Sequence, residues 1–243
     1  MTKQRKRHIV PYRPIEWVFL DAGGTLLGTN PEEEHWYEQF FIDACREQGA
    51  AVSLAEVHEA LHDANASCPV HPRCSTPEQV RQYWEHVYGT VFKRLLPGKD
   101  WLAVAQHYID RFEQGEFVQL FPDTLTTLEA VRRMGRRIAV VSNFGTYLEH
   151  FLRRCGIAHY FEFAVISAAE GCEKPQPEIF HRALKRAGAR PESVLFVGDN
   201  LEEDYRAANA VGIHALLVDR HNKHAEHEDV ARIRRLDELV NYL

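Results

Sequence analysis

Long apolar runs are absent from this 243-residue sequence, and none approaches the roughly 18–20 residues that cross a membrane. No apolar signal core follows the basic residues near the amino terminus. The sequence also lacks a basic excess, because its formal net charge is −6 and nucleic-acid binding needs a basic face. These absences predict a cytoplasmic protein with no membrane or nucleic-acid partner, and they leave its oligomeric state open.

Cysteine is scarce and scattered. There are five cysteines, and the spacing of the closest pair, Cys68 and Cys74, matches no common zinc motif. We therefore expect free thiols, as in a reducing compartment. Hydrophobic residues make up 45% of the chain and charged residues 26%, which is typical of a globular protein with a sizeable core.

Apolar runs and helical patterns alternate along much of the sequence. Buried strands are predicted at residues 17–20, 138–141, 163–166, 194–197 and 214–218, and helical patterns separate the last four of them. Such alternation predicts a doubly wound, Rossmann-like α/β core with a parallel sheet covered on both faces. Residues 30–120 read as almost wholly helical instead. We therefore predict a core of residues 1–29 and 121–243, and an inserted helical cap of residues 30–120.

Polar residues follow four of the predicted strands. In chain order they are Asp21, then Ser142 and Asn143, then Lys174, and finally Asp199 with Asp204 close behind. Because the carboxyl ends of parallel strands meet at one edge of a sheet, we expect these residues to share a crevice.

This set of residue types suits phosphoryl transfer. A carboxylate such as Asp21 can act as a nucleophile. Asp21 and Asp199, with a backbone carbonyl near Gly23, offer the oxygen ligands that Mg²⁺ prefers. Lysine, hydroxyl and amide groups can neutralise or bind phosphoryl oxygens.

The segments that carry these residues resemble the haloacid dehalogenase (HAD) superfamily of hydrolases. The matching segments, in the order found in that family, are Asp21-Ala22-Gly23-Gly24-Thr25-Leu26, Val140-Val141-Ser142-Asn143, Glu173-Lys174-Pro175-Gln176-Pro177-Glu178-Ile179-Phe180 and Val197-Gly198-Asp199-Asn200 with Asp204. The resemblance covers nearly the whole chain after residue 15. The helical insertion after the first segment is similar to the C1-type cap of the family.

The resemblance implies a Mg²⁺-dependent phosphatase that acts on a small phosphorylated metabolite through an aspartyl-phosphate. It implies that Asp21 is the nucleophile, that Ser142 and Asn143 bind the substrate, and that Lys174 pairs with Asp21 and the phosphate. It further implies that the Mg²⁺ ligands are Asp21, the Gly23 carbonyl and Asp199. Asp204 would support the metal site from nearby.

Glycine occupies position 23, where phosphatases of this family usually carry an aspartate that protonates the leaving group and later activates water. Such acid–base help is typically worth about 10²–10⁴-fold in rate. Three hypotheses remain. The first is a phosphatase whose protons come from the cap, the substrate or water. The second is a 2-haloacid dehalogenase, whose halide leaving group needs no proton, and the third is a non-catalytic protein that binds phosphate and metal. The Gly198-Asp199-Asn200 pattern speaks against the dehalogenase. A phosphonatase would need a cap lysine near the hinge, and none lies between Thr25 and Lys93. We favour the phosphatase.

Several other residues are weaker candidates. Residues 32–34 (all glutamate) and His35 could reach the crevice, but they are more typical of the acidic start of a helix. The loop at residues 67–77 is a further candidate for substrate selection.

Aromatic residues and histidines form two further groups. The cap aromatics are predicted to pack between helices, with a few available to select substrate: Trp36, Tyr37, Tyr83, Trp84 and Tyr88. His221, His224 and His227 recur every three residues, which suits a metal-binding helix face, but their polar setting favours a solvated loop or helix start.

Overall fold

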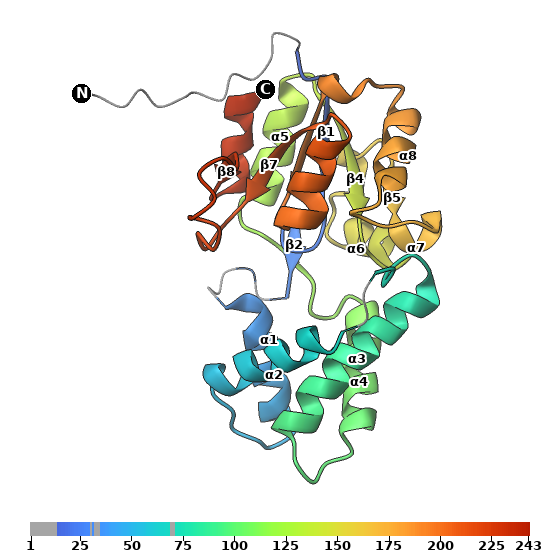
Figure 1. Cartoon of the computed structure of the whole chain (residues 1–243). Helices are drawn as coiled ribbons and strands as arrows, with labels where there is room; N and C mark the ends of the chain where they lie inside the picture. Colours follow the sequence, from blue (N-terminus) through green and yellow to red (C-terminus); the bar gives the residue numbers. More distant parts are fainter. Residues whose placement is uncertain (1–13, 30, 32–34, 69–70) are drawn as a thin grey trace, which may run out of the picture.

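A parallel β-sheet forms the centre of the larger of two bodies in the computed structural model, which describes residues 14–29, 31, 35–68 and 71–243 (Figure 1). Within these residues the sheet has six strands in the order β5-β4-β1-β6-β7-β8, and all its pairings are parallel. The strands are β1 (Trp17–Leu20), β4 (Arg137–Ser142), β5 (Ala164–Ile166), β6 (Val194–Gly198), β7 (His214–Val218) and β8 (Arg232–Ile233). The predicted doubly wound α/β core is confirmed.

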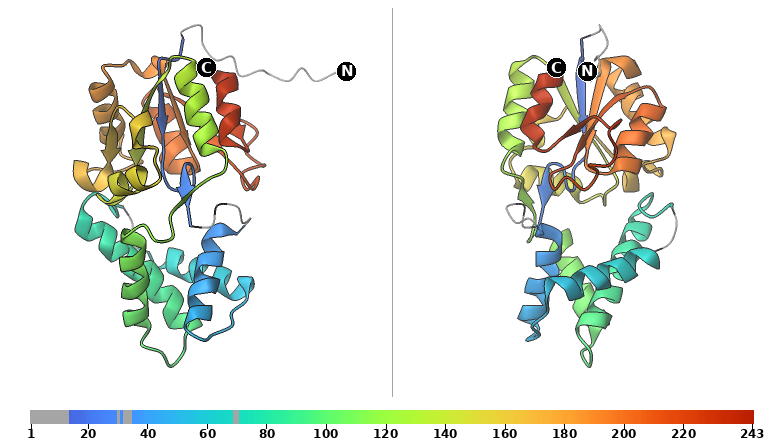
Figure 2. Two further views of the ribbon diagram at one scale, coloured as in Figure 1. Left: turned by 180° about the vertical axis from the view of Figure 1, so that it is seen from behind. Right: turned by 60° about the vertical axis from the view of Figure 1, so that its left-hand side comes forward.

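Helices cover both faces of the sheet, as Figure 2 shows. Val18 and Leu20 of β1 pack into one cluster, whereas Trp17 and Phe19 pack into another on the opposite face. This alternation follows from the strand period of two residues, and burial on both sides explains why the strands are continuously apolar. The first cluster is covered by α5 (Thr124–Arg133), α6 (Leu148–Arg154) and the C-terminal 3₁₀ turn (Leu236–Tyr242), and the second by α8 (Pro177–Ala187) and α9 (Ala207–Ala210).

The second body contains α1 (Trp36–Glu47), α2 (Leu54–Ala66), α3 (Pro77–Leu95) and α4 (Trp101–Glu113), which enclose a hydrophobic cluster of their own. Local sequence sets the ends of these helices. Ser53 and Glu56 form a reciprocal capping box at the start of α2. Thr76 caps α3, and Pro77 occupies its first turn. α4 ends at Glu113, because Gly115, just after it, adopts a left-handed φ of 76°.

Two short strands lie where the chain passes between the bodies. β2 (Leu27–Gly28) and β3 (Gln119–Leu120) pair in antiparallel fashion, and neither strand was predicted from the sequence. β8 and the short α7 (Ser167–Glu170) were not anticipated either. The structure has further 3₁₀ turns at Ala158–Tyr160 and Pro191–Ser193.

The helical segment that follows β6 begins at Leu201. A wide, π-type turn at Leu201–Arg206 leads into α9, because the Asn200 side chain accepts the backbone N–H groups of Glu202 and Glu203, both at 3.0 Å. Asp204 therefore lies inside a helical turn at the edge of the sheet.

The structure also bears on the cysteines and on the absence of long apolar runs. All five cysteines lie in the described residues and are free, as predicted. Among the helices that the structure describes, none is long and apolar enough to cross a membrane.

Candidate active site

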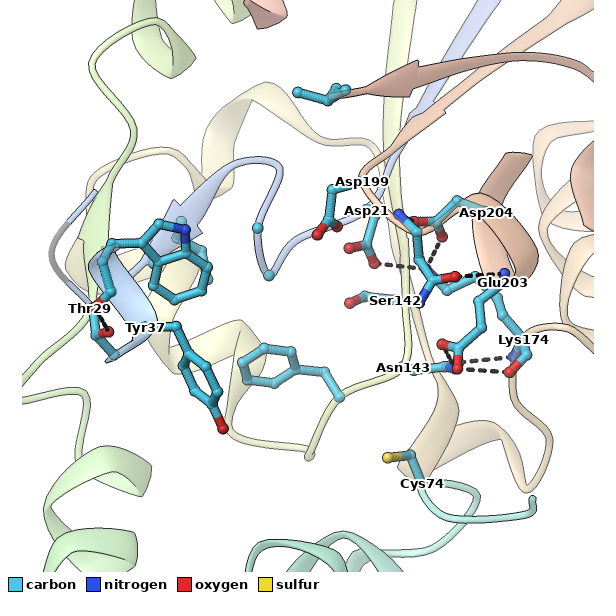
Figure 3. A pocket seen from close by; sticks show the side chains of 18 of the residues that line it. Asp21, Thr29, Tyr37, Cys74, Ser142, Asn143, Lys174, Asp199, Glu203 and Asp204 are labelled. Atoms are coloured by element: carbon cyan, nitrogen blue, oxygen red, sulfur yellow. Dashed lines mark hydrogen bonds and ion pairs between the residues drawn. The ribbon is translucent and has the colours of Figure 1, made fainter. Parts of the chain in front are cut away.

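The carboxyl edge of the sheet and the helical body enclose a cavity of about 470 Å³ (Figure 3). Every residue predicted for the site contributes to its lining: Asp21, Gly23, Ser142, Asn143, Lys174, Asp199 and Asp204. They lie at the carboxyl ends of four different strands or in the segments that follow them, so the structure brings them together as the parallel sheet requires.

Lys174 is the centre of charge in this cavity. It is almost fully buried, and its Nζ donates to Asp21 Oδ1 at 2.7 Å and also to Asp204 Oδ1. Burial alone would lower the pKa of Lys174, but the carboxylates of Asp204 and Asp21 raise it above its usual value. The lysine is therefore a permanent cation that orients the Asp21 carboxylate.

Asp21, Asp199 and Asp204 form an acidic cluster in which carboxylate oxygens lie within 4.8 Å of one another. Burial raises the pKa of Asp204 to about 6 against the opposing effect of Lys174. Desolvation and repulsion from the carboxylates of Asp21 and Asp204 raise the pKa of Asp199, whose side chain is exposed to the cavity. Such repulsion favours a cation between the carboxylates.

Gly24 shapes the space in which Asp199 lies. Its φ is 74°, and a Cβ atom at this position would lie 2.3 Å from Asp199 Oδ2. The missing side chain lets the Asp199 carboxylate lie against the backbone of the first loop, close to Asp21. An all-oxygen donor set of this kind fits Mg²⁺ better than a softer metal. Asp204 is less available, since its oxygens already accept from Lys174 and from the Asn200 N–H.

Ser142 and Asn143, at the end of β4, differ in their surroundings. The buried Ser142 hydroxyl points into the space beside Asp21 (Figure 3). The Asn143 amide binds protein instead: its Oδ1 accepts the Lys174 N–H at 2.7 Å, and its Nδ2 donates to the Lys174 carbonyl at 2.8 Å and to Glu203 at 2.9 Å. The Asn143 side chain, which we expected to bind substrate, thus holds the backbone of Lys174.

The backbone at Gly23 has room for a Cβ atom. Among the described residues, a Cβ atom at this position would approach only Phe144 Cε2, at an ordinary 3.6 Å. The absence of an acid at position 23 is therefore not forced by crowding at the Cβ position.

Two acidic residues that the sequence analysis did not single out also line the cavity. Glu173 is fully buried, and Glu203 is partly buried. Both accept hydrogen bonds from residues 71–75, within the loop proposed above as a candidate for substrate selection. Glu173 could have been noticed because it directly precedes Lys174 in a strand-end loop.

Some of the weaker candidates line the cavity, and others do not or lie outside the described residues. Residues 32–34 lie outside the described residues. All five cap aromatics line the cavity and also pack against other rings, as in the Tyr83–Trp84 pair with centroids 4.9 Å apart. His221 and His224 lie at the cavity lining. The segment from 219 to 229 forms turns, so the three histidines do not share a helix face.

Known proteins resemble the chain in sequence. A Danio rerio protein called haloacid dehalogenase-like hydrolase domain-containing protein 3 is 30% identical over 238 residues, which cover 93% of this chain and 95% of that protein. The Mus musculus protein of the same name is 38% identical over 141 residues, 57% of this chain and 56% of its own length. The glyceraldehyde 3-phosphate phosphatase of Methanopyrus kandleri is 38% identical over 119 residues, 49% of this chain and 50% of that enzyme. The chain thus spans about half the length of the mouse and archaeal relatives.

Solved structures share the fold. The HAD-hydrolase YfnB from Bacillus subtilis, in a structure bound to magnesium, superposes with a TM-score of 0.74 at 17% identity, covering 94% of this chain and 98% of YfnB. The sequence profile of the haloacid dehalogenase-like hydrolases matches residues 15–212. This match includes every predicted site residue, and the chain belongs to the haloacid dehalogenase-like hydrolase family.

Proposed function

We propose that this hydrolase is a Mg²⁺-dependent phosphatase that acts through an aspartyl-phosphate on Asp21, with a small phosphorylated metabolite as substrate. The observation that carries the proposal is the buried Lys174–Asp21 contact of 2.7 Å beside the Asp199 carboxylate. Phosphatases among the relatives, including the Methanopyrus kandleri enzyme, support the same class of reaction. A C1-type cap of residues 30–120 and a cytoplasmic location belong to this proposal.

Each residue of the site has a role in the proposed reaction. An Asp21 oxygen attacks phosphorus, and the bond from phosphorus to the leaving oxygen breaks. Lys174 orients Asp21 and offers positive charge to the phosphoryl group, while the Ser142 hydroxyl donates to a phosphoryl oxygen. The leaving oxygen takes up a proton from solvent. Water then attacks phosphorus and loses a proton to solvent as the bond from phosphorus to the Asp21 oxygen breaks, which releases inorganic phosphate and restores the carboxylate.

The metal would be held by Asp21, Asp199 and the Gly23 carbonyl. When bound, Mg²⁺ supplies positive charge that neutralises the phosphoryl oxygens. Asp204 acts one step away, because its contacts to Lys174 and to the Asn200 N–H hold the lysine and the loop after β6 in place.

An aryl phosphate such as p-nitrophenyl phosphate tests the proposal most directly, because its leaving group barely needs a proton. We expect turnover with Mg²⁺ that EDTA abolishes and added Mg²⁺ restores. Release of halide from 2-haloacids would instead support the dehalogenase reading. No turnover of either substrate class, with phosphate binding retained in calorimetry, would contradict the proposal in favour of a binding protein.

Gly23→Asp should create the missing acid. Because the position has room for a Cβ atom, we expect turnover of alkyl phosphates to rise on the order of tenfold or more, while aryl phosphates change little. Steady-state kinetics on the two substrate classes measure this. Unchanged or lower turnover of alkyl phosphates would show that another group already serves as the acid that protonates the leaving group. Gly24→Ala, one residue away, is a contrast variant: its positive φ and the collision with Asp199 should lower activity on both classes.

A further inference from the structure

One buried carboxylate receives a cluster of hydrogen bonds from the helical body. Glu173 accepts from His71 Nδ1 at 2.5 Å, from the Arg73 N–H at 2.8 Å, from Ser75 Oγ at 3.0 Å, and from the Cys74 N–H. We call His71–Ser75, which directly precedes the N-cap residue Thr76 of α3, the docking segment. Burial alone would raise the pKa of Glu173, but these hydrogen bonds outweigh it and lower the pKa. The hydrogen bonds from residues 71–75 thus stabilise the ionised form of the Glu173 carboxylate, although it is fully buried.

A second contact leads from the docking segment to the catalytic lysine. Arg73 Nη2 donates to Glu203 Oε1 at 2.8 Å, and Glu203 Oε2 accepts from Asn143 Nδ2 at 2.9 Å. Asn143 in turn binds both the N–H and the carbonyl of Lys174. A continuous chain of hydrogen bonds therefore joins Arg73 to Lys174, whose Nζ binds Asp21.

A third contact reaches the loop after β4. Ser167 Oγ donates to the Cys74 carbonyl at 2.6 Å and accepts the Phe144 N–H at 3.1 Å. Figure 3 shows Cys74 beneath Asn143 and Glu203. The docking segment consequently contacts the loop with Lys174 directly through Glu173, and it is linked to the loop with Asn143 through the side chains of Ser167 and Glu203.

Glu173 and Lys174 are consecutive residues that face different partners. The Glu173 side chain binds the docking segment, and the Lys174 side chain binds Asp21. If the docking segment withdrew, the buried Glu173 carboxylate would rehydrate and its loop would lose its outer attachment, because burial of an ion is tolerated only when it is fully hydrogen-bonded.

We propose that Glu173 is a positioning residue: by binding the docking segment it fixes the loop that presents Lys174 to Asp21, so that docking of the helical body completes the active site. This inference rests on the proposed phosphatase function for its kinetic consequence only. Its structural consequence, ordering of the Lys174 backbone by a distant segment, holds for any reaction at this site.

The full-length Glu173→Gln variant tests the inference, with Glu170→Gln as the matched control. Glu170 lies three residues earlier, and its carboxylate binds Arg182 and Arg186 of α8 instead. Amide hydrogen exchange should accelerate at least about tenfold in residues 71–75 and 172–176 of Glu173→Gln, and stay unchanged there in the control. With p-nitrophenyl phosphate and Mg²⁺, kcat should fall about 10–100-fold with a much smaller change in KM, because small misplacements of a catalytic group are costly. Glu173→Asp, which keeps the charge, should recover part of kcat.

Two results would overturn the inference. Exchange in residues 71–75 that is unaffected by Glu173→Gln would show that Glu173 does not hold the docking segment. Faster exchange there with unchanged protection of Lys174 and unchanged kcat would show that docking does not position the lysine. If the wild-type chain hydrolyses no phosphate, the proposed function fails while the exchange of the Lys174 amide still decides the inference.

Arg73→Gln provides an independent test should Glu173→Gln fold poorly. The side chains of Arg73 and Glu203 are both partly exposed, and Glu203 keeps its hydrogen bond from Asn143 Nδ2, so the replacement removes the Arg73–Glu203 contact without leaving a fully buried charge. We expect the same pattern, with a smaller increase in exchange at residues 172–176. No increase there would count against the inference.

Discussion

Asp21→Asn is expected to lower phosphatase turnover by at least about 10³-fold, the scale of loss seen when an attacking residue is removed from an enzyme. Asparagine keeps the shape of the side chain and one acceptor oxygen, but an amide does not form the acyl-phosphate. The change also removes one charge from the acidic cluster, so repulsion on Asp199 and Asp204 decreases. Lys174 loses Asp21 as a charged partner but keeps Asp204, so the variant should fold about as stably as the wild type while being inactive.

Single-turnover and steady-state assays with p-nitrophenyl phosphate, together with thermal unfolding, measure both effects. Asp123→Asn is a suitable control, since Asp123 is also a buried aspartate, bound by Arg220 and by the Leu236 N–H. It should lose stability and keep most of its turnover, the reverse of Asp21→Asn. Turnover of Asp21→Asn within tenfold of wild type would contradict the nucleophile assignment.

Lys174→Met is expected to destabilise the protein by about 3–5 kcal/mol at neutral or higher pH, because it leaves Asp21 and Asp204 without their shared cation. The loss depends on pH in a defined direction. A carboxyl whose folded-state pKa is raised binds a proton more tightly in the folded protein, so the fold gains stability as pH falls through that raised pKa. The pKa of Asp204 is already about 6 with Lys174 present and rises further without it. The difference in the free energy of unfolding between wild type and Lys174→Met should therefore shrink as pH falls from 8 to 5.

Urea unfolding of wild type and variant at both pH values measures this deficit. Lys185→Met is the matched control, because Lys185 lies exposed on α8 and such surface changes are usually within about 0.5 kcal/mol. A deficit below about 1 kcal/mol at pH 8, or one that grows toward pH 5, would contradict the assignment of Lys174 as the counter-charge of the cluster.

The sheet and the composition of the site could be predicted because both follow from local patterns. Trp17–Leu20 is continuously apolar, which is what burial on both faces of a parallel strand requires. Once the strands are parallel, their carboxyl ends must share an edge, and this alone places Asp21, Lys174 and Asp199 together.

Other features depend on contacts that no local pattern reports. β2 and β3 have two residues each, too few to show a periodicity, and they pair across the whole helical insertion. The partners of Glu173 lie about a hundred residues away, so the sequence could not show whether this acid is solvated or buried. Asn143 illustrates a further limit: an amide next to Ser142 suits either a phosphate or a backbone, and only the structure shows it bound to Lys174.

The pairing of β2 with β3 has a mechanical consequence. The outgoing and returning connections of the helical body pair with each other at Leu27–Leu120 and Gly28–Gln119, so they form one two-stranded ribbon instead of two independent connections. A ribbon resists splaying and shear more than it resists bending across its face. We therefore expect the helical body to rotate chiefly about a single axis. Such a rotation would bring residues 71–75 back into contact with Glu173 in the same register each time.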